Sequence, residues 1–516
     1  MELRAYAFSA PQFPNGGPNP NVLNSKDPAS LYNACRVAGY EARTGRGAWS
    51  HSNFSLIDPS RPIPVALFES LTFAKAALEA VIVDIRPNFI LIGAMSVCLR
   101  GAIECAAHLK RRLGDHVCIV LGGRHVNESV FVGHNGSVCH HSSSPLRLMA
   151  EGHIGNVFDV IVSGDGEFVV KRLGELVAKV IHQQKPASAI VKHLDDLADT
   201  PGSWIVGTID DGKIVTKIGA TPMPAELPIP CEIFGVRSRF SCFDGAPTAH
   251  VFSDVGQGCI YNCAFCSEAI DIVGAPRRFS TSADRLVDQL DGARRVISKS
   301  YDGQTGAAFV EDSTLLGMNR RLISRFVGIL SDRQEPSVFG GQATIDQILL
   351  NPEALRSLVS VGLCYLFVGL ETSIPEKVPG FHKRRSGSAP WLHRARDAIE
   401  LLDNLGIKVG VSLLFGLGEL KSDREQLFQS LAEWRHCFAS PEIISMNWAV
   451  QHPLKGKDGG ANYQYIDWLA DETELNIIQS FGEASTRYPM RGCPPPTYGE
   501  LSDVVSALEG LELPHS

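Results

Sequence analysis

Short apolar runs that alternate with amphipathic stretches constrain the fold of this 516-residue chain more than any other feature. Two of the runs, Phe89–Gly93 and Cys118–Gly123, are almost continuously apolar, as parallel strands buried on both faces usually are. Helix-period segments such as Gly101–Leu113 and Glu167–Gln183 accompany them. Alternating strand and helix patterns predict βαβ units around a parallel sheet. Residues 1–190 are therefore expected to form a Rossmann-like, doubly wound α/β domain.

A second alternating series, with longer helical segments, occupies residues 246–440. Its candidate strands are Gly306–Val310, Ser337–Gln342, Tyr365–Val368 and Lys408–Phe415, and a further candidate strand, Ile443–Asn447, follows just beyond it. Between the two series, residues 191–245 contain a hairpin pattern around Asp211-Gly212 and then several prolines, which predicts a linker with a small β element. Residues 441–516 are mixed helix and loop and are expected to form a small C-terminal region.

Three cysteines at the start of the second series, Cys259, Cys263 and Cys266, have the spacing C-x3-C-x2-C. Three thiolates can hold a 4Fe–4S cluster and leave one iron open, whereas a fourth cysteine would normally close the site. The next cysteine along the chain is Cys364. Zinc is the main alternative, but it takes four ligands, usually in two pairs, and the only histidine nearby is His250. The spacing therefore favours an iron–sulfur cluster.

Composition argues against two classes of partner. The formal net charge of −8 and the pI near 6.1 give no electrostatic case for nucleic acid or an anionic membrane. The chain has no apolar run of about 18 residues, and its N-terminus lacks the pattern of an export signal. The thirteen cysteines are scattered and odd in number, which favours reduced thiols over a disulfide framework. We therefore expect a cytoplasmic protein with no nucleic-acid or membrane partner.

The motif Cys259-Ile-Tyr-Asn-Cys263-Ala-Phe-Cys266 resembles the signature of the radical S-adenosylmethionine (SAM) superfamily. The resemblance extends to four strand ends that follow in the expected order, Phe309–Ser313, Gly340–Thr344, Phe367–Ser373 and Phe415–Gly418. It implies a partial (βα)6 barrel that carries a 4Fe–4S cluster on the three cysteines and binds SAM, with residues 441–516 covering the barrel. The SAM-binding residues that it implies are Tyr261, Phe265, Gln342, Glu371, Ser412 and Gly416.

Several of these residues have a purely structural alternative. Glu371 could be a solvated strand-end carboxylate, and Asp312 could cap the helix that follows it. Gln342 could satisfy backbone groups, and Gly416 could serve only the geometry of the chain. Cys493 lies in a proline-rich segment that could cover the active site or form a surface loop.

The loops that follow the strands of the first series carry a second resemblance. Gly122-Gly-Arg-His125 and Gly164-Asp-Gly-Glu167 are similar to loops of the cobalamin-binding domain that precedes many radical SAM cores. The cobalamin-binding residues that this implies are Ser96, Gly122, Gly123, His125 and Gly164. The D-x-H-x-x-G motif that supplies a histidine to cobalt elsewhere is missing, and so is the dinucleotide fingerprint G-x-G-x-x-G. Cobalamin binding and a degenerate domain without cobalamin both remain open.

The leading hypothesis for function follows from the two resemblances together. They imply that a methyl group of SAM passes by way of cobalamin to a small natural-product precursor, with a reductase, flavodoxin or ferredoxin as electron donor. Without cobalamin, the 3-amino-3-carboxypropyl group of SAM could be transferred instead, as in radical SAM proteins of arsinothricin biosynthesis, with trivalent arsenic as acceptor. A non-catalytic iron–sulfur protein is the alternative from another class. It predicts a fourth ligand close to the triad and no SAM-contact strand ends, and the sequence has the opposite features.

Overall fold

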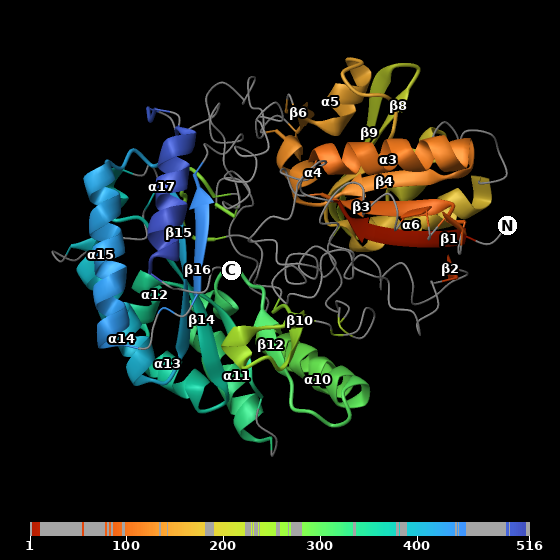
Figure 1. The fold of residues 1–516 in the computed structure, drawn as a ribbon. Helices are drawn as coiled ribbons and strands as arrows, with labels where there is room; N and C mark the ends of the chain where they lie inside the picture. Colours follow the sequence, from red (N-terminus) through yellow and green to blue (C-terminus); the bar gives the residue numbers. More distant parts are fainter. Residues whose placement is uncertain are drawn as a thin grey trace. The chain divides into compact units, whose positions relative to one another are not determined.

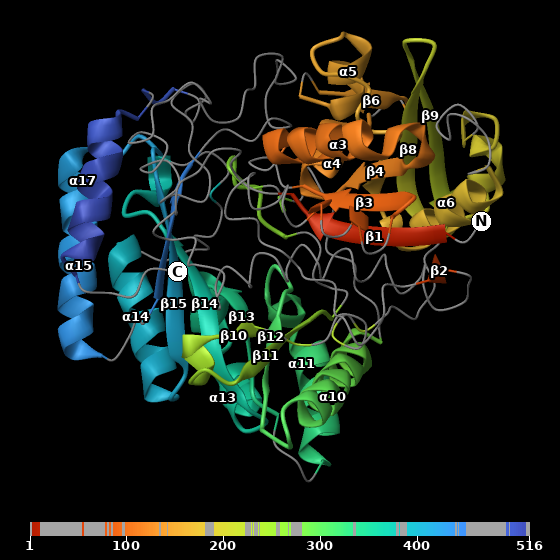
Figure 2. The ribbon, with the colours of Figure 1, turned by 45° about the vertical axis from the view of Figure 1, so that its right-hand side comes forward.

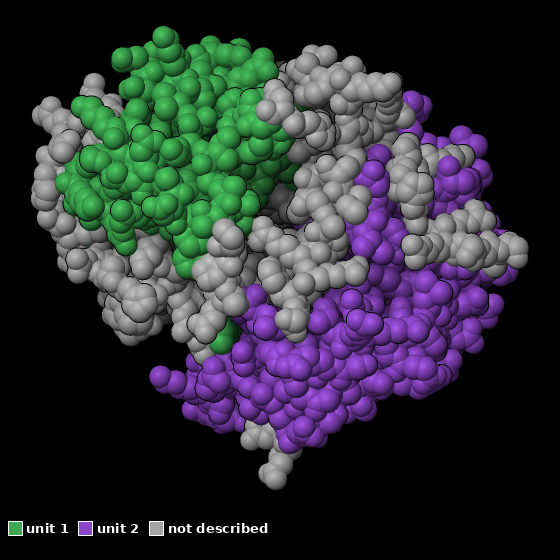
Figure 3. All heavy atoms as spheres, turned by 180° about the vertical axis from the view of Figure 1, so that it is seen from behind, with its two compact units in different colours: residues 1–18, 22–235, 457–463 green, residues 19–21, 236–456, 464–516 purple. Residues whose placement is uncertain are grey.

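The computed structural model describes residues 3–10 and 54–55 and, with short gaps, residues 78–180, 190–221, 229–269, 281–449 and 492–511. The chain divides into two compact units, one made mainly of residues 22–235 and the other mainly of residues 236–456 and 464–516 (Figure 3). None of the described helices is long and apolar enough to cross a membrane. Each unit is built on its own sheet.

The first unit contains a seven-stranded sheet with the order β2-β1-β3-β4-β7-β8-β9 (Figure 1). Its elements are β1 (Leu3–Ser9), β2 (Phe54–Ser55), β3 (Phe89–Gly93), α3 (Leu99–Leu113), β4 (Cys118–Gly122), α4 (Arg124–Ser129), β5 (Val130–Val132), β6 (Val138–His140), α5 (Pro145–Ala150), β7 (Val160–Gly164), α6 (Gly166–Val180), β8 (Gly202–Asp210) and β9 (Lys213–Thr221). Strands β2, β1, β3, β4 and β7 are parallel, and β8 and β9 are antiparallel additions at the edge.

The parallel strands of this unit have the 2-1-3-4-5 order of a doubly wound fold, which confirms the predicted fold class. Strand β3 is buried at every position and β4 at all but its last, as their continuous apolar sequences predicted. In such sheets ligands bind outside the carboxyl ends of the strands, near the point where the strand order reverses. Here that point lies between β1 and β3.

The hairpin expected near Asp211 exists but extends the first sheet. Asp211 and Gly212 both have positive φ, 46° and 74°, so the two-residue turn matches the twist of its strands. Strand β8 pairs with β7, and its Trp204 and Val206 enter the core beneath α6. The first unit therefore continues to Gly235, beyond the boundary expected at residue 190, because the hairpin has an apolar face to bury.

The second unit contains six parallel strands in chain order, β11 to β16, with the short β10 antiparallel at the β11 edge (Figure 2). Its elements are β10 (Ser238–Arg239), β11 (Pro247–Val251), α10 (Ser282–Ser300), β12 (Ala307–Val310), α11 (Arg320–Ser331), β13 (Phe339–Thr344), α12 (Ile345–Leu350), α13 (Pro352–Val359), β14 (Leu363–Glu371), α14 (Trp391–Asn404), β15 (Lys408–Phe415), α15 (Lys421–Cys437), β16 (Ile443–Trp448) and α17 (Tyr498–Glu509). Among the described residues β10 and β16 do not pair, so the sheet is a partial barrel, as predicted.

Strand β11 is the one barrel strand that the sequence did not predict. It is only five residues long, and Pro247, Thr248 and His250 interrupt its apolar pattern. All five residues are nevertheless buried, because α10 and strand β12 pack against β11. Burial of these polar residues depends on tertiary neighbours that no local pattern encodes.

Candidate functional site

The register of the second sheet separates an apolar outer face from a mixed inner face. Residues paired in register point to the same face of a sheet. The outer row Ala343, Val368, Val411 and Ile444 is fully buried, and the helices lie along this side of the sheet (Figure 2). The corresponding inner row consists of Thr344, Gly369, Ser412 and Ser445. The inner face therefore has small and polar side chains across four neighbouring strands.

Aromatic side chains fill the inner face toward the amino ends of the strands. Phe243 contacts Tyr365 edge-on at 5.9 Å between ring centroids, and Phe309 lies 6.1 Å from Tyr365. Two glycines make room for these rings. A Cβ at Gly340 would lie 2.9 Å from the Phe243 ring, and one at Gly410 would lie 2.2 Å from the Tyr365 hydroxyl. Side-chain packing thus fills the inner face of the sheet near the amino ends of the strands, so we expect a ligand near their carboxyl ends.

Two predicted SAM-binding residues lie on this inner face, near the carboxyl ends. Gln342 on β13 pairs with Phe367, and Ser412 on β15 lies one row further along, next to Gly369. Both side chains are partly accessible, whereas their outer-face neighbours are buried. The structure therefore brings Gln342 and Ser412 to the same part of the barrel interior, which is where βα barrels have their active sites.

Glu371, at the end of β14, has the most unusual backbone of the site. Its φ is +66°, and the pairing of β14 with β15 shifts register between Gly369 and Glu371. A left-handed conformation costs a residue with a Cβ about 1–2 kcal/mol, and such strain clusters at functional sites. Glu371 is also buried, with 6% of its surface exposed, so it is not a solvated strand-end carboxylate. The bulge re-aims this carboxylate at the carboxyl edge of the sheet.

Gly416 follows β15 in a tight exit that requires glycine. Its φ is +80°, and a Cβ at this position would lie 1.9 Å from the indole Nε1 of Trp448. The Glu419 carboxylate accepts hydrogen bonds from the backbone N–H groups of Gly416 and Leu417, each at 2.7 Å. Chain geometry therefore accounts for this glycine, and the exit loop is held rigid just beyond the Ser412 row.

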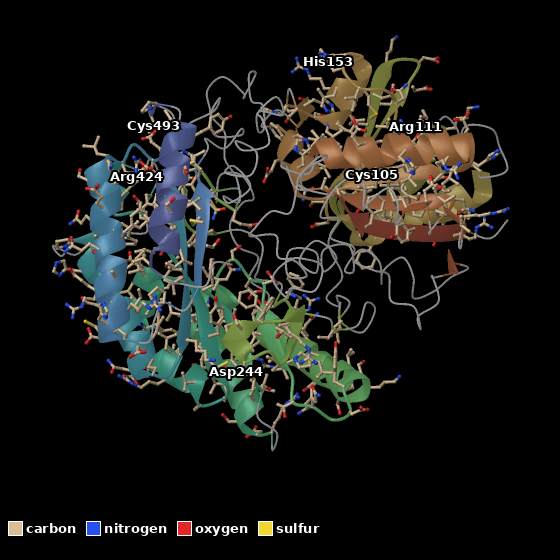
Figure 4. All side chains as sticks on the ribbon, in the orientation of Figure 1. Cys105, Arg111, His153, Asp244, Arg424 and Cys493 are labelled. Carbon is tan, nitrogen blue, oxygen red and sulfur yellow. The ribbon has the colours of Figure 1, made fainter. Side chains whose placement is uncertain are left out.

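An ion network that the sequence did not predict supports this exit loop. Arg424 lies on α15 (Figure 4). It bridges Glu419, at 3.4 Å, and Glu500 on α17, at 3.0 Å. Only 10% of the Arg424 side chain and 5% of the Glu419 side chain are exposed. In the same region a Cβ at Gly418 would lie 3.2 Å from the Sγ of the half-buried Cys493. The C-terminal segment thus packs on the exit of β15.

The cysteine loop follows β11, at the carboxyl edge of the same sheet. Its two ends meet because the N–H of Cys259 donates to the carbonyl oxygen of Glu268 at 2.7 Å. Within the loop, the N–H of Cys266 donates to the carbonyl of Cys263 at 3.1 Å, which forms a turn. Tyr261 is buried and Phe265 is half-buried. The loop therefore keeps three reduced thiols on one short, closed segment.

This donor set fits a 4Fe–4S cluster better than a single metal ion. No group of three His, Cys, Asp or Glu side chains within the described ranges is arranged to hold one ion. A 4Fe–4S cluster makes a different demand, because each thiolate binds a separate iron. Three separated thiols on one closed loop satisfy that demand and leave one iron without a cysteine. Cys259, Cys263 and Cys266 are the residues that would hold the cluster.

Asp312 does not have the helix-capping role considered for it from sequence. It does not cap α11, because the side chain of Asn319 accepts the N–H groups of Arg321 and Leu322 at that helix start. Instead the fully buried Asp312 carboxylate accepts hydrogen bonds from Ser253 and from the N–H of Leu316. It joins the end of β11 to the turn after β12, and sequence offered no signal for this long-range contact.

The predicted cobalamin-binding residues lie at the carboxyl edge of the first sheet, apart from Ser96, which is outside the described residues. Gly123 has a φ of +95°, and a Cβ there would lie 2.7 Å from the backbone nitrogen of Ala94. Gly164 has a φ of +87°, and its Cβ would lie 2.3 Å from the carbonyl oxygen of Ser203. A Cβ at Gly122 would make only an ordinary contact, at 3.5 Å. Two of the three glycines are therefore required by the close approach of neighbouring backbone.

His125 is fully buried in the helix that follows these glycines. Its Nε2 lies 3.0 Å from the carbonyl oxygen of Ser143, so the neutral ring donates this hydrogen bond. Burial lowers the pKa of His125, which favours the neutral form. The side chain is engaged within the unit and connects α4 to Ser143, just before α5.

Comparisons with known proteins agree with this architecture. No family model matches the chain. The hopanoid C-3 methylase of Methylococcus capsulatus is 26% identical over 370 residues, which cover 69% of this chain and 63% of the methylase. An uncharacterized methyltransferase of Pyrococcus horikoshii is 20% identical over 403 residues, 74% of this chain and 76% of that protein. The chain thus spans less than two thirds of the length of the hopanoid methylase that it matches.

Solved structures share the fold at low sequence identity. The cobalamin-dependent SAM radical enzyme OxsB, solved with aqua-cobalamin and SAM bound, has a TM-score of 0.51 at 15% identity, over 84% of this chain and 52% of OxsB. The radical SAM methyltransferase TsrM of Kitasatospora setae, solved with cobalamin and a [4Fe-4S] cluster, has a TM-score of 0.51 at 14% identity, over 99% of this chain and 91% of TsrM. The chain therefore shares its fold with these two solved structures, over most of its own length.

Proposed function

We propose that this chain is an enzyme that reductively cleaves SAM and transfers a methyl group, by way of cobalamin, to a small-molecule acceptor. The observation that carries the proposal is the closed loop of three cysteines at the carboxyl edge of a partial barrel with a small, polar inner row. Relatives that are methylases support methyl transfer as the type of reaction. The 4Fe–4S cluster would supply the electron that breaks a C–S bond of SAM, after an external flavodoxin, ferredoxin or reductase has reduced it.

The residues of the barrel have distinct tasks in this proposal. Cys259, Cys263 and Cys266 hold the cluster, and the backbone bond between Cys259 and Glu268 keeps the three thiols together. Gln342, Ser412 and Glu371 would orient SAM, because their polar groups lie at the carboxyl half of β13 to β15. The aromatic packing below them closes the barrel floor to water, which protects reactive species from side reactions.

Cobalamin would be held at the carboxyl edge of the first sheet, near Gly122, Gly123 and Gly164. The strand order of this sheet supports a ligand crevice at that edge. The Nε2 of His125 is engaged with the carbonyl of Ser143, so His125 is not expected to be a ligand of cobalt. The cofactor would be held through backbone groups of the strand exits.

A second candidate function keeps the cluster and SAM but omits cobalamin. One observation favours it: the backbone contacts of Gly123 and Gly164 and the burial of His125 explain these residues without any ligand. In that case the 3-amino-3-carboxypropyl group of SAM would be transferred to a soft acceptor such as trivalent arsenic.

One anaerobic experiment distinguishes these possibilities. The cluster is reconstituted and reduced, SAM is added with or without cobalamin, and the fragments of SAM are identified by mass spectrometry. 5′-Deoxyadenosine and S-adenosylhomocysteine that appear together only with cobalamin are expected for the methylase. 5′-Methylthioadenosine without cobalamin would establish the second candidate, and no cleavage under either condition would contradict both. Cys263→Ser should abolish all products, whereas the control Cys364→Ser, at the amino end of β14, should retain them.

A further inference from the structure

Three consecutive residues after β12, Glu311, Asp312 and Ser313, fasten the chain on both sides of the cysteine loop. We call them the β12 exit triplet. Each of its side chains reaches a different point: the end of β11, the segment between β11 and the cysteines, or the loop itself.

The first contact is a buried pair at the end of β11. The Oε1 of Glu311 lies 2.7 Å from the Nδ1 of His250, and the two side chains are only 2% and 7% exposed. The N–H of Glu311 also donates to the carbonyl of Val251 at 2.8 Å. The residue that follows β12 is therefore connected to the end of β11 by a backbone hydrogen bond and by a side-chain contact.

The second contact holds Ser253, two residues beyond the end of β11. The Asp312 carboxylate accepts the N–H of Ser253 at 2.9 Å and the hydroxyl of the same serine. It also accepts the N–H of Leu316 at 3.1 Å. Leu316 and Met318 have φ values of 47° and 48°, so the turn is strained and depends on such anchors.

The third contact reaches the cysteine loop directly. The hydroxyl of Ser313 donates to the Oε2 of Glu268 at 3.1 Å. The carbonyl oxygen of the same Glu268 accepts the N–H of Cys259. The hydrogen bond from Ser313 to Glu268 thus connects the triplet to the residue that closes the loop.

We propose that the β12 exit triplet positions the three cysteines, and through them the open iron that would receive SAM. This inference rests on the proposed function, because it concerns the placement of the cluster. Groups that orient metal ligands without touching the metal commonly change metal affinity or activity by about ten- to a hundredfold when they are removed. Asp312 should have the larger effect, since it is fully buried and its carboxyl group accepts several hydrogen bonds. Ser313 should have the smaller effect, since its hydroxyl is neutral and its contact with Glu268 is only partly buried.

The test is the change in the electron paramagnetic resonance spectrum of the reduced cluster on addition of SAM, scaled to cluster content. Asp312→Asn places an amide N–H₂ against donors that need an acceptor. The SAM concentration that gives half of the spectral change should therefore be about tenfold or more above that of the wild type. Ser313→Ala should require a few-fold more, and Ser313→Thr, which keeps the hydroxyl, should restore the response of the wild type. Asp346→Asn is the matched control, because Asp346 is equally buried but pairs with Arg394 between the outer helices.

The outcomes separate this inference from the proposed function. If the wild type responds to SAM and both Asp312→Asn and Ser313→Ala respond with the same SAM dependence, the positioning role is refuted and the proposed function stands. If the wild type binds no cluster, both are refuted. If Asp312→Asn does not fold, the comparison of Ser313→Ala with Ser313→Thr still decides, because these variants differ in whether the partly buried hydroxyl next to Glu268 is kept.

Discussion

Replacing Arg424 by Met should weaken the second unit through one identifiable group, the Glu419 carboxylate. Arg424 is the cation between Glu419 and Glu500, and Met keeps an apolar stem of similar length while removing the charge. Removing one partner of a buried ion pair costs about 3–5 kcal/mol, because the other charge is left without compensation. Glu419 keeps its two backbone N–H donors at 2.7 Å, which reduces the penalty. We therefore expect a loss of about 2–3 kcal/mol in the free energy of unfolding of this unit.

The contribution of Glu500 should be much smaller. Its side chain is 40% exposed, so its pair with Arg424 is worth about 0.5–1 kcal/mol at most. Glu500→Gln therefore serves as the control that removes the outer half of the network and leaves Glu419 paired. The difference between the two variants isolates the buried half.

Thermal unfolding followed by circular dichroism, together with limited proteolysis near α17, measures these effects. For a unit of this size the Arg424→Met loss corresponds to a decrease of about 5–10 °C in the midpoint of the transition. Proteolysis near α17 should also become faster, because the helix loses an attachment to α15. A midpoint for Arg424→Met within a degree of the wild type would refute the reasoning, since Glu419 would then not depend on Arg424.

Four further predictions concern single side chains. Gly123→Ala should cost about 2 kcal/mol or more in unfolding free energy, because its Cβ meets the Ala94 backbone, whereas Gly122→Ala should cost under about 1 kcal/mol. Denaturant melts of the two variants compare these costs directly, and equal costs would contradict the steric argument. Glu371→Gly should relieve about 1 kcal/mol of backbone strain yet weaken SAM binding measured by calorimetry, and unchanged SAM affinity would remove Glu371 from the site. Burial raises the pKa of Cys364 to about 11, so its reactive thiolate is scarce below that pH. Iodoacetamide at pH 8.5 should therefore alkylate Cys364 far more slowly than the exposed Cys437, as measured by peptide mapping. Equal rates of alkylation would rule out the raised pKa. Burial acts to raise the pKa of Glu500, but hydrogen bonds from Thr497 and Arg424 outweigh burial, so the pKa in the folded protein is below its usual 4.5. The stability that ionised Glu500 contributes is therefore complete above pH 4.5 and is lost as the pH falls through the lower folded pKa. Glu500→Gln should flatten the profile of unfolding free energy against pH in that acid range.

The sequence by itself determined the elements whose signal is local. Continuous apolar runs predicted β3 and β4, and the apolar run from Lys408 to Phe415 has the same bounds as β15. The three cysteines lie within eight residues of one another along the chain, so their joint role was readable without a fold. The turn at Asp211-Gly212 was also local, because its residues can adopt positive φ.

Only the tertiary structure decided which side chains meet. Register placed Ser412 between Gly369 and Ser445, and a one-residue slip would have turned the same serine to the outer face. Asp312 reaches Ser253, 59 positions away, and Arg424 reaches Glu500, 76 positions away, so no periodicity connects them. The buried β11 and the strained Glu371 depend likewise on neighbours from other strands. Local patterns encode which face of an element is apolar, whereas the position of a carboxylate or hydroxyl within a site depends on how the elements pack.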